Sequence, residues 1–137
     1  MIPALGHSNF KIEDGTMEFG VGHHGEAGTK VEKLKSASEM AQEMAETILN
    51  DFDFEEGKEV AVMLSGLGAT PVMELYVLYD EVEKVLAKAG HKVWKTYIGN
   101  YVTSLDMNGA SLTIVDLDDE IKELLSEPAV PIGMKNY

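Results

Sequence analysis

The stretch that decides the fold is EVAVMLSGLGATPV at residues 59–72, where an apolar strand meets the start of a helix. Residues 59–64 form a near-continuous apolar run bounded by turn residues, which is typical of a strand buried on both faces of a sheet. Thr70 is placed to cap the next helix, Pro71 to be its first residue, and Gly90 to end it after residues 72–89. The sequence therefore predicts a central strand, a sharp glycine turn and a helix packed against the sheet.

The glycine turn raises the question of nucleotide binding. Backbone N–H groups at a helix start can hold phosphate. The dinucleotide-binding pattern, however, would need glycine where Pro71 stands, and the lysine of a P-loop is absent. We therefore interpret Gly66 and Gly68 as residues that let the strand turn sharply and bring the helix close to the sheet, and we expect no nucleotide on this chain.

An earlier helix is indicated by a capping box and an apolar stripe. Ser36 and Glu39 have the capping-box spacing, and Met40, Met44 and Ile48 recur at every fourth residue, so residues 37–52 are expected to be helical. A methionine stripe can also line an adaptable binding groove. At this spacing it is more often part of the core.

The last third of the chain predicts two strands and a helix. Residues 92–98 and 111–115 alternate as strands, and the Asn108-Gly109 turn between them predicts that they pair with each other. The acidic run at residues 116–120 suits the positive end of a helix dipole, so a final helix is expected through Leu125. Because this run lacks the glycine and the terminal glutamate of a calcium loop, we do not interpret it as a cation site. Residues 128–137 are expected to form a terminal arm.

The opening of the chain predicts a β-hairpin that leads into a glycine-rich loop with two histidines. Residues 10–12 and 17–21 are the expected strands, and residues 13–15 the turn between them. If the second strand stays extended, Gly22, His24 and Glu26 share one face and His23 lies on the other, which would leave His24 accessible and His23 largely buried. Glycines beside an imidazole leave room for a ligand, and Glu26 is spaced to orient the His24 ring.

A purely structural interpretation of this loop stays open. The glycines could mark a bulge, and His24 could be a polar residue whose ring is satisfied by a neighbouring carbonyl. A metal site is not expected in either case, because adjacent histidines on a strand diverge and the chain has no cysteine.

Composition indicates one α/β domain covering residues 1–137. A length of 137 residues with 45% hydrophobic content suits a single core, and we expect a mixed sheet of about five strands packed with about three helices. The net charge of −13 disfavours nucleic acid and anionic membrane surfaces as partners. The absence of cysteine is compatible with a reducing compartment, and no signal peptide or membrane span is recognised, so a cytoplasmic protein is expected.

Three segments resemble the dihydroxyacetone kinase family, specifically the second half of its substrate-binding, DhaK-type subunit. Residues 17–28, MEFGVGHHGEAG, resemble the family segment Met-Glu-Leu-Gly-x-Gly-Ile-His-Gly-Glu-Pro-Gly. Residues 60–78 and 99–113 carry the other two motifs, VAVMLSGLGATPVMELYVL and GNYVTSLDMNGASLT. The three motifs stand in the family's order and together cover nearly the whole chain.

This resemblance implies a covalent binding chemistry. In the family the histidine of the His-Gly-Glu motif, here His24, attacks the ketone carbon of dihydroxyacetone and holds the triose as a hemiaminal, with Gly22 and Glu26 beside it. Phosphoryl transfer would then use ATP, or ADP in a phosphotransferase-system relay, with Mg on a separate nucleotide-binding subunit or domain. A homo-oligomer is also implied.

Departures from the family leave alternatives open. Ala27 replaces the usual proline, His23 an aliphatic residue and Ser65 a common asparagine. Family subunits are considerably longer, and their acid/base aspartate and second histidine belong to a first half that is missing here, so this chain is expected to be inactive alone. It could be a fragment, the second half of a split gene or a stand-alone relative. A ligand-sensing transcriptional co-regulator and a structural or assembly domain are the alternative functions.

Overall fold

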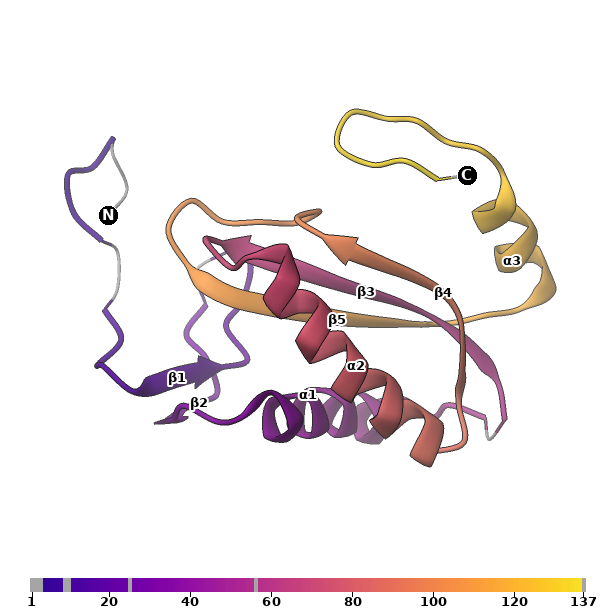
Figure 1. Ribbon diagram of the computed structural model, residues 1–137, viewed down its shortest axis with the longest axis horizontal. Coiled ribbons are helices and arrows are strands. Elements are labelled where there is room, and N and C mark those ends of the chain that lie inside the picture. The colour runs from indigo at the N-terminus through magenta and orange to yellow at the C-terminus, as the bar shows by residue number, and fades with distance from the viewer. Residues whose placement is uncertain (1–3, 9–10, 25, 56, 137) are drawn as a thin grey trace.

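The computed structural model describes residues 4–8, 11–24, 26–55 and 57–136. These residues contain five strands and three helices, which confirms the predicted α/β class (Figure 1). The elements run in the order β1 (Thr16–Phe19), β2 (Lys30–Lys33), α1 (Ala37–Asp51), β3 (Glu59–Gly68), α2 (Val72–Lys88), β4 (Lys92–Gly99), β5 (Asn108–Asp116) and α3 (Asp119–Ser126).

The strands form two sheets. β3 is central in a mixed sheet of order β4-β3-β5, parallel to β4 and antiparallel to β5. β1 and β2 form a separate antiparallel hairpin. The prediction of a central strand is confirmed, but the predicted pairing of β4 with β5 is wrong, because β3 lies between them. Asn108 and Gly109 begin β5, where they pair with Gly68 and Leu67, and do not form a hairpin turn.

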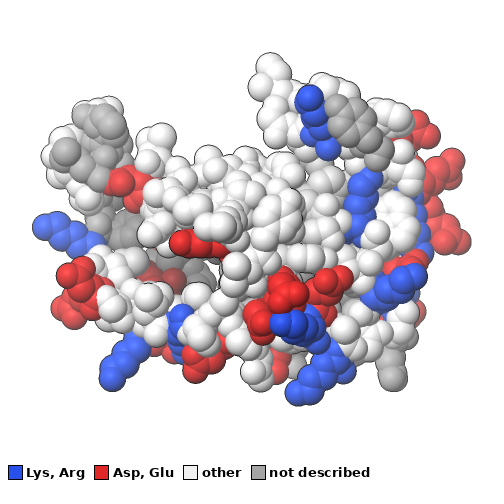
Figure 2. All heavy atoms as spheres, in the orientation of Figure 1, with Lys and Arg blue, Asp and Glu red and all other residues white. Residues whose placement is uncertain are grey.

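The core lies between the sheet and the helices. Val60, Val62 and Leu64 of β3 are fully buried and belong to one cluster with residues of α2 and α1. That cluster also contains Ala41, Leu75, Leu78, Val82 and Leu86. Met40 and Met44 pack against it, so the methionine stripe belongs to the core as expected. On the face drawn in Figure 2, charged side chains gather mainly over the helices and at the ends of the molecule.

The start of α2 differs in detail from the prediction. Pro71 occupies the N-cap position and makes no side-chain capping bond. The hydroxyl of Thr70 instead donates to the carbonyl of Gly109 at 2.8 Å. β3 also runs on to Gly68, so the glycines belong to the strand. The reason is that the backbone stays paired with β5 until Gly68, whose φ of +71° then turns the chain.

The predicted N-terminal hairpin is wrong in its partner strand. β1 pairs with β2, with Phe19 opposite Lys30, while residues 11 and 12 are not in a strand and Phe10 lies outside the described residues. The turn at residues 13–15 forms, closed by a 3.1 Å bond from the N–H of Thr16 to the carbonyl of Glu13. The sequence KVEK of β2 lacks the apolar alternation by which a strand is recognised.

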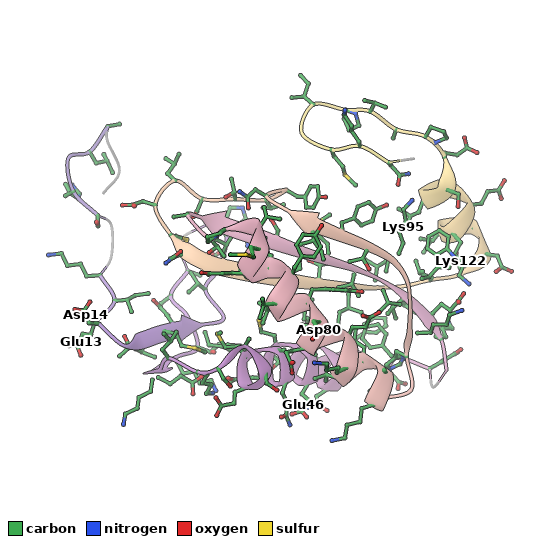
Figure 3. All side chains as sticks on the ribbon, in the orientation of Figure 1. Glu13, Asp14, Glu46, Asp80, Lys95 and Lys122 are labelled. Atoms are coloured by element: carbon green, nitrogen blue, oxygen red, sulfur yellow. The ribbon has the colours of Figure 1, made fainter. Side chains whose placement is uncertain are left out.

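The C-terminal segment packs on the β4 side of the sheet. α3 begins at Asp119, and Asp118 caps it by accepting a bond from the N–H of Ile121 at 2.7 Å, so the acidic run does start a helix. Lys95 of β4, labelled in Figure 3, donates to the carbonyl of Leu125 at 2.7 Å. Asn136 is buried and donates to that same carbonyl at 2.8 Å. No helix among the described residues is long and apolar enough to cross a bilayer.

Candidate functional site

The candidate site is the connection between β1 and β2, residues 20–29, at the tip of the hairpin. Its base is closed by the N–H of Thr29, which donates to the carbonyl of Phe19 at 2.8 Å. A carboxylate oxygen of Glu18 accepts from the N–H of Gly28 at 2.7 Å. A Cβ on Gly28 would lie 2.5 Å from Glu18 Cγ and 2.6 Å from the carbonyl oxygen of Phe19, so only glycine fits there. The loop is therefore held at its base by the strand that precedes it.

His24 and Glu26 lie together at the far end of this loop. The backbone N–H of His24 donates to Glu26 Oε2 at 3.0 Å, and His24 Nδ1 lies 3.6 Å from Glu26 Oε1. The His24 side chain is 91% exposed and the Glu26 side chain 62%. Backbone N–H groups, its own and that of His24, lower the pKa of the Glu26 carboxyl, which is therefore ionised at neutral pH.

Gly22 completes the group. Its N–H donates to the carbonyl of Glu26 at 3.0 Å, and a Cβ at this position would lie only 2.7 Å from Glu26 Cβ. The structure thus brings Gly22, His24 and Glu26 together within a loop, whereas the sequence predicted that they would share one face of an extended strand. Gly25, the centre of the His-Gly-Glu motif, lies outside the described residues.

The prediction that His23 is buried is wrong. Both His23 and His24 are exposed, because the strand ends at Phe19 and the alternation of faces does not continue to the histidines. Gly20 causes this ending, since its φ of +74° turns the chain out of the extended conformation. The accessibility predicted for His24 is present, but the loop produces it and the strand does not.

Sequence reasoning missed two residues that support the loop, Glu18 and Thr29. Besides the bond from its N–H, Thr29 donates its hydroxyl to the carbonyl of Phe19 at 3.1 Å. Glu18 and Gly28 are ten residues apart, and nothing in their spacing marks them as partners. Recognising β2 as the return strand of the hairpin would have revealed them, because the pairing of β1 with β2 places Glu18 and Thr29 at the base of the loop.

The other two family-like segments form one unit at the end of β3. The buried hydroxyl of Ser65 accepts from the N–H groups of Tyr101 and Val102, both at 3.0 Å. A Cβ on Gly66 would collide with the Asn100 side chain, so the space beside this glycine is occupied by Asn100. The remaining histidines lie elsewhere, with His7 exposed and His91 buried beside Phe54. The described residues contain no group of three or more histidine or acidic side chains placed to hold a metal.

Fold and site together define an α/β domain that presents a histidine on a hairpin loop. The chain belongs to the Dak1 family, whose domain model matches residues 1–132. It is 42% identical over 119 residues to a PTS-dependent dihydroxyacetone kinase 1, dihydroxyacetone-binding subunit DhaK, from Listeria innocua serovar 6a, a match that covers 87% of this chain and 36% of the relative.

The chain is also similar to an erythrulose kinase and to a solved co-activator structure. A D-erythrulose kinase from Mycolicibacterium smegmatis is 38% identical over 128 residues, which cover 93% of this chain and 22% of that enzyme. The solved structure of the dihydroxyacetone kinase operon co-activator Dha-DhaQ superposes with a TM-score of 0.83 at 30% identity, covering 89% of this chain and 38% of that one. The chain thus spans well under half the length of the curated relatives it matches.

Proposed function

We propose that this chain is the histidine-bearing portion of a dihydroxyacetone-binding subunit, and that His24 captures the triose covalently as a hemiaminal. One observation carries the proposal. The His24 ring is 91% exposed, and its Nδ1 lies 3.6 Å from the ionised Glu26 carboxylate. A carboxylate on that side favours a proton on Nδ1, which leaves the lone pair of Nε2 free to act as a nucleophile.

The capture step balances as an addition. Nε2 attacks the carbonyl carbon of dihydroxyacetone, the C=O π pair moves to oxygen, and a new N–C bond forms. The alkoxide gains a proton, and the ring loses its Nδ1 proton to solvent or to Glu26, so that the product is a neutral carbinol on a neutral imidazole. Glycerol has no carbonyl carbon to attack. Capture therefore discriminates by reactivity, where shape alone would separate two such similar molecules poorly.

The kinase activity would belong to a larger assembly. The acid/base groups are proposed to come from the rest of the subunit, and ATP or ADP with Mg from a separate nucleotide-binding subunit or domain. The substrate-binding set on this chain is His24, Gly22 and Glu26. This assignment is supported by the similarity to dihydroxyacetone-binding and erythrulose kinase proteins over most of the chain.

A ligand-sensing co-regulator is the second candidate function. It is favoured by the similarity to the operon co-activator Dha-DhaQ, whose fold matches this chain closely. Both functions need ketone capture, and only the kinase needs phosphoryl transfer. Adding a nucleotide-binding kinase subunit and ATP, or the corresponding phosphotransferase-system proteins, separates them by whether dihydroxyacetone phosphate forms.

The proposal is tested with dihydroxyacetone labelled with ¹³C at its carbonyl carbon, on the chain combined with the first half of a family subunit, which does not carry the His-Gly-Glu motif. Capture moves the carbonyl resonance into the range of tetrahedral carbon and adds the mass of one triose. His24→Ala is expected to abolish both signals, while the adjacent substitution His23→Ala, and His7→Ala and His91→Ala, leave them nearly unchanged. An adduct that survives in a folded His24→Ala variant would show that the covalent anchor is misassigned.

A further inference from the structure

In the part of the chain that the structure describes, the outer edge of β5 is an unpaired sheet edge. β5 pairs with β3 in unbroken register along one side, and within the described residues no strand pairs with its other side. Edge strands are normally guarded by charges, proline or a bulge, because their free N–H and C=O groups recruit another chain. Between Asn108 and Val115, β5 has none of these guards. The edge is thus open to a further strand.

A groove of about 880 Å³ lies at the C-terminal end of this edge, between residues 114–116 of β5 and the C-terminal part of α1. Its apolar lining consists of Ile48, Phe52, Phe54, Ile114 and Val115. Phe52 and Val115 are large and apolar, yet they are 54% and 41% exposed. A strand added to β5 would direct every second side chain toward the face of the sheet that α1 covers, and those beside residues 114–116 would enter this groove. Edge and groove therefore fit the same ligand, an extended polypeptide with alternating apolar residues.

The charge of the groove lining indicates the sign of the charge that the ligand should carry. Asp51 and Asp116 line it, and its described lining contains no lysine or arginine. Lys58 is already paired with Asp116, at 3.3 Å, and the adjoining surface of α1 carries Glu46, labelled in Figure 3. A second copy of the chain would bring a further net charge of −13 to this acidic rim, which opposes self-association. A basic segment is favoured for the same reason.

We propose that the β5 edge and this groove form a docking site for an extended segment of a partner polypeptide, with apolar residues at alternate positions and basic residues at its ends. The backbone of the segment bonds to the free groups of β5, its apolar side chains fill the groove, and its basic ends face Asp51 and the neighbouring Glu46. This docking involves no residue of the histidine loop, so it stands or falls independently of ketone capture.

The test uses the ¹⁵N-labelled chain and a synthetic peptide as long as β5, with valine at every second position, threonine between and lysine at both ends. Binding is expected to shift β5 amide resonances and to slow hydrogen exchange at alternate β5 amides. A peptide of the same composition without the alternation, and one with glutamate in place of lysine, are expected to bind at least about tenfold more weakly.

Two substitutions locate the site on the chain. Phe52→Asp and Asp51→Lys are each expected to weaken binding of the lysine-ended peptide about tenfold. Met73→Asp on α2 and Glu123→Lys on α3 are expected to leave its binding unchanged. No shift in β5, or equal loss in the control variants, overturns the proposal. A dimer of the chain alone that Phe52→Asp dissociates, seen by sedimentation, overturns the choice of a heterologous partner.

Discussion

Glu18 and Gly28 are joined by a 2.7 Å hydrogen bond from the backbone N–H of Gly28 to the Glu18 carboxylate, across the base of the histidine loop. Glu18 belongs to β1 and is partly buried, so its position is fixed by the hairpin ladder. The bond therefore fixes the base of a loop that has no regular secondary structure of its own. The loop that carries His24 is thus anchored at its base by Glu18, a residue of the preceding strand.

Glu18→Ala is expected to loosen this loop while leaving the main sheet intact. Loss of a charge-assisted bond to a partly buried N–H should lower the free energy of unfolding by about 1–2 kcal/mol. Hydrogen exchange at Gly28 should accelerate, and capture of labelled dihydroxyacetone should fall with it. Glu18→Gln keeps an acceptor oxygen, so its exchange rate at Gly28 and its capture should lie between those of the unchanged chain and of Glu18→Ala. Unchanged exchange at Gly28 in Glu18→Ala would contradict this role.

Gly22→Ala is expected to disrupt the pairing of Glu26 with His24. The added Cβ would lie 2.7 Å from Glu26 Cβ, so the Glu26 side chain must move away from the N–H of His24. Glu26 would then titrate closer to its ordinary pKa, because that N–H is among the groups that lower it. NMR titration of the carboxyl carbon measures this. Gly109→Ala is the matched control, since its Cβ meets Leu67 at ordinary distances of 3.5 and 3.7 Å, and it should leave Glu26 unchanged.

Glu59 should make stability depend on pH in the acid range. Bonds from Lys122 and Lys92, at 2.7 and 2.9 Å, lower the pKa of the Glu59 carboxyl from 4.5 to about 2. Because the folded pKa is the lower one, the stabilisation is complete above pH 4.5 and is lost as the pH falls toward 2. Glu59→Gln should lower the urea midpoint at neutral pH and flatten its fall across this window. The exposed Glu123→Gln change should do neither.

Ser65→Ala is expected to release the loop at residues 100–107. The Ser65 hydroxyl is 1% exposed and accepts from two backbone N–H groups, which alanine would leave without that partner. The cost should be about 1–3 kcal/mol in the free energy of unfolding, measured by urea denaturation. Exchange at Tyr101 and Val102 should accelerate. Ser111→Ala, at the cross-strand neighbour of Ser65 on β5, should have little effect on either measurement.

The sequence alone determined the elements whose signals are local. The capping box at Ser36 and Glu39 fixes the start of α1, because both of its bonds join residues three positions apart. The apolar run of β3 requires burial on both faces and therefore a central place in the sheet. Gly22, His24 and Glu26 meet because they are separated by only a few residues in a short loop, so their grouping could also be read from the chain.

Only the tertiary structure decided how distant segments pair. β1 pairs with β2, whose exposed KVEK sequence has no apolar pattern. This pairing depends on backbone hydrogen bonds, which the side-chain sequence does not reveal. β4 and β5 were expected to pair because a turn signal lies before β5, yet each pairs with the buried β3, which lies between them. The support from Glu18 and the open edge of β5 follow from these pairings. They are non-local contacts, whose energies depend on residues that only folding brings together.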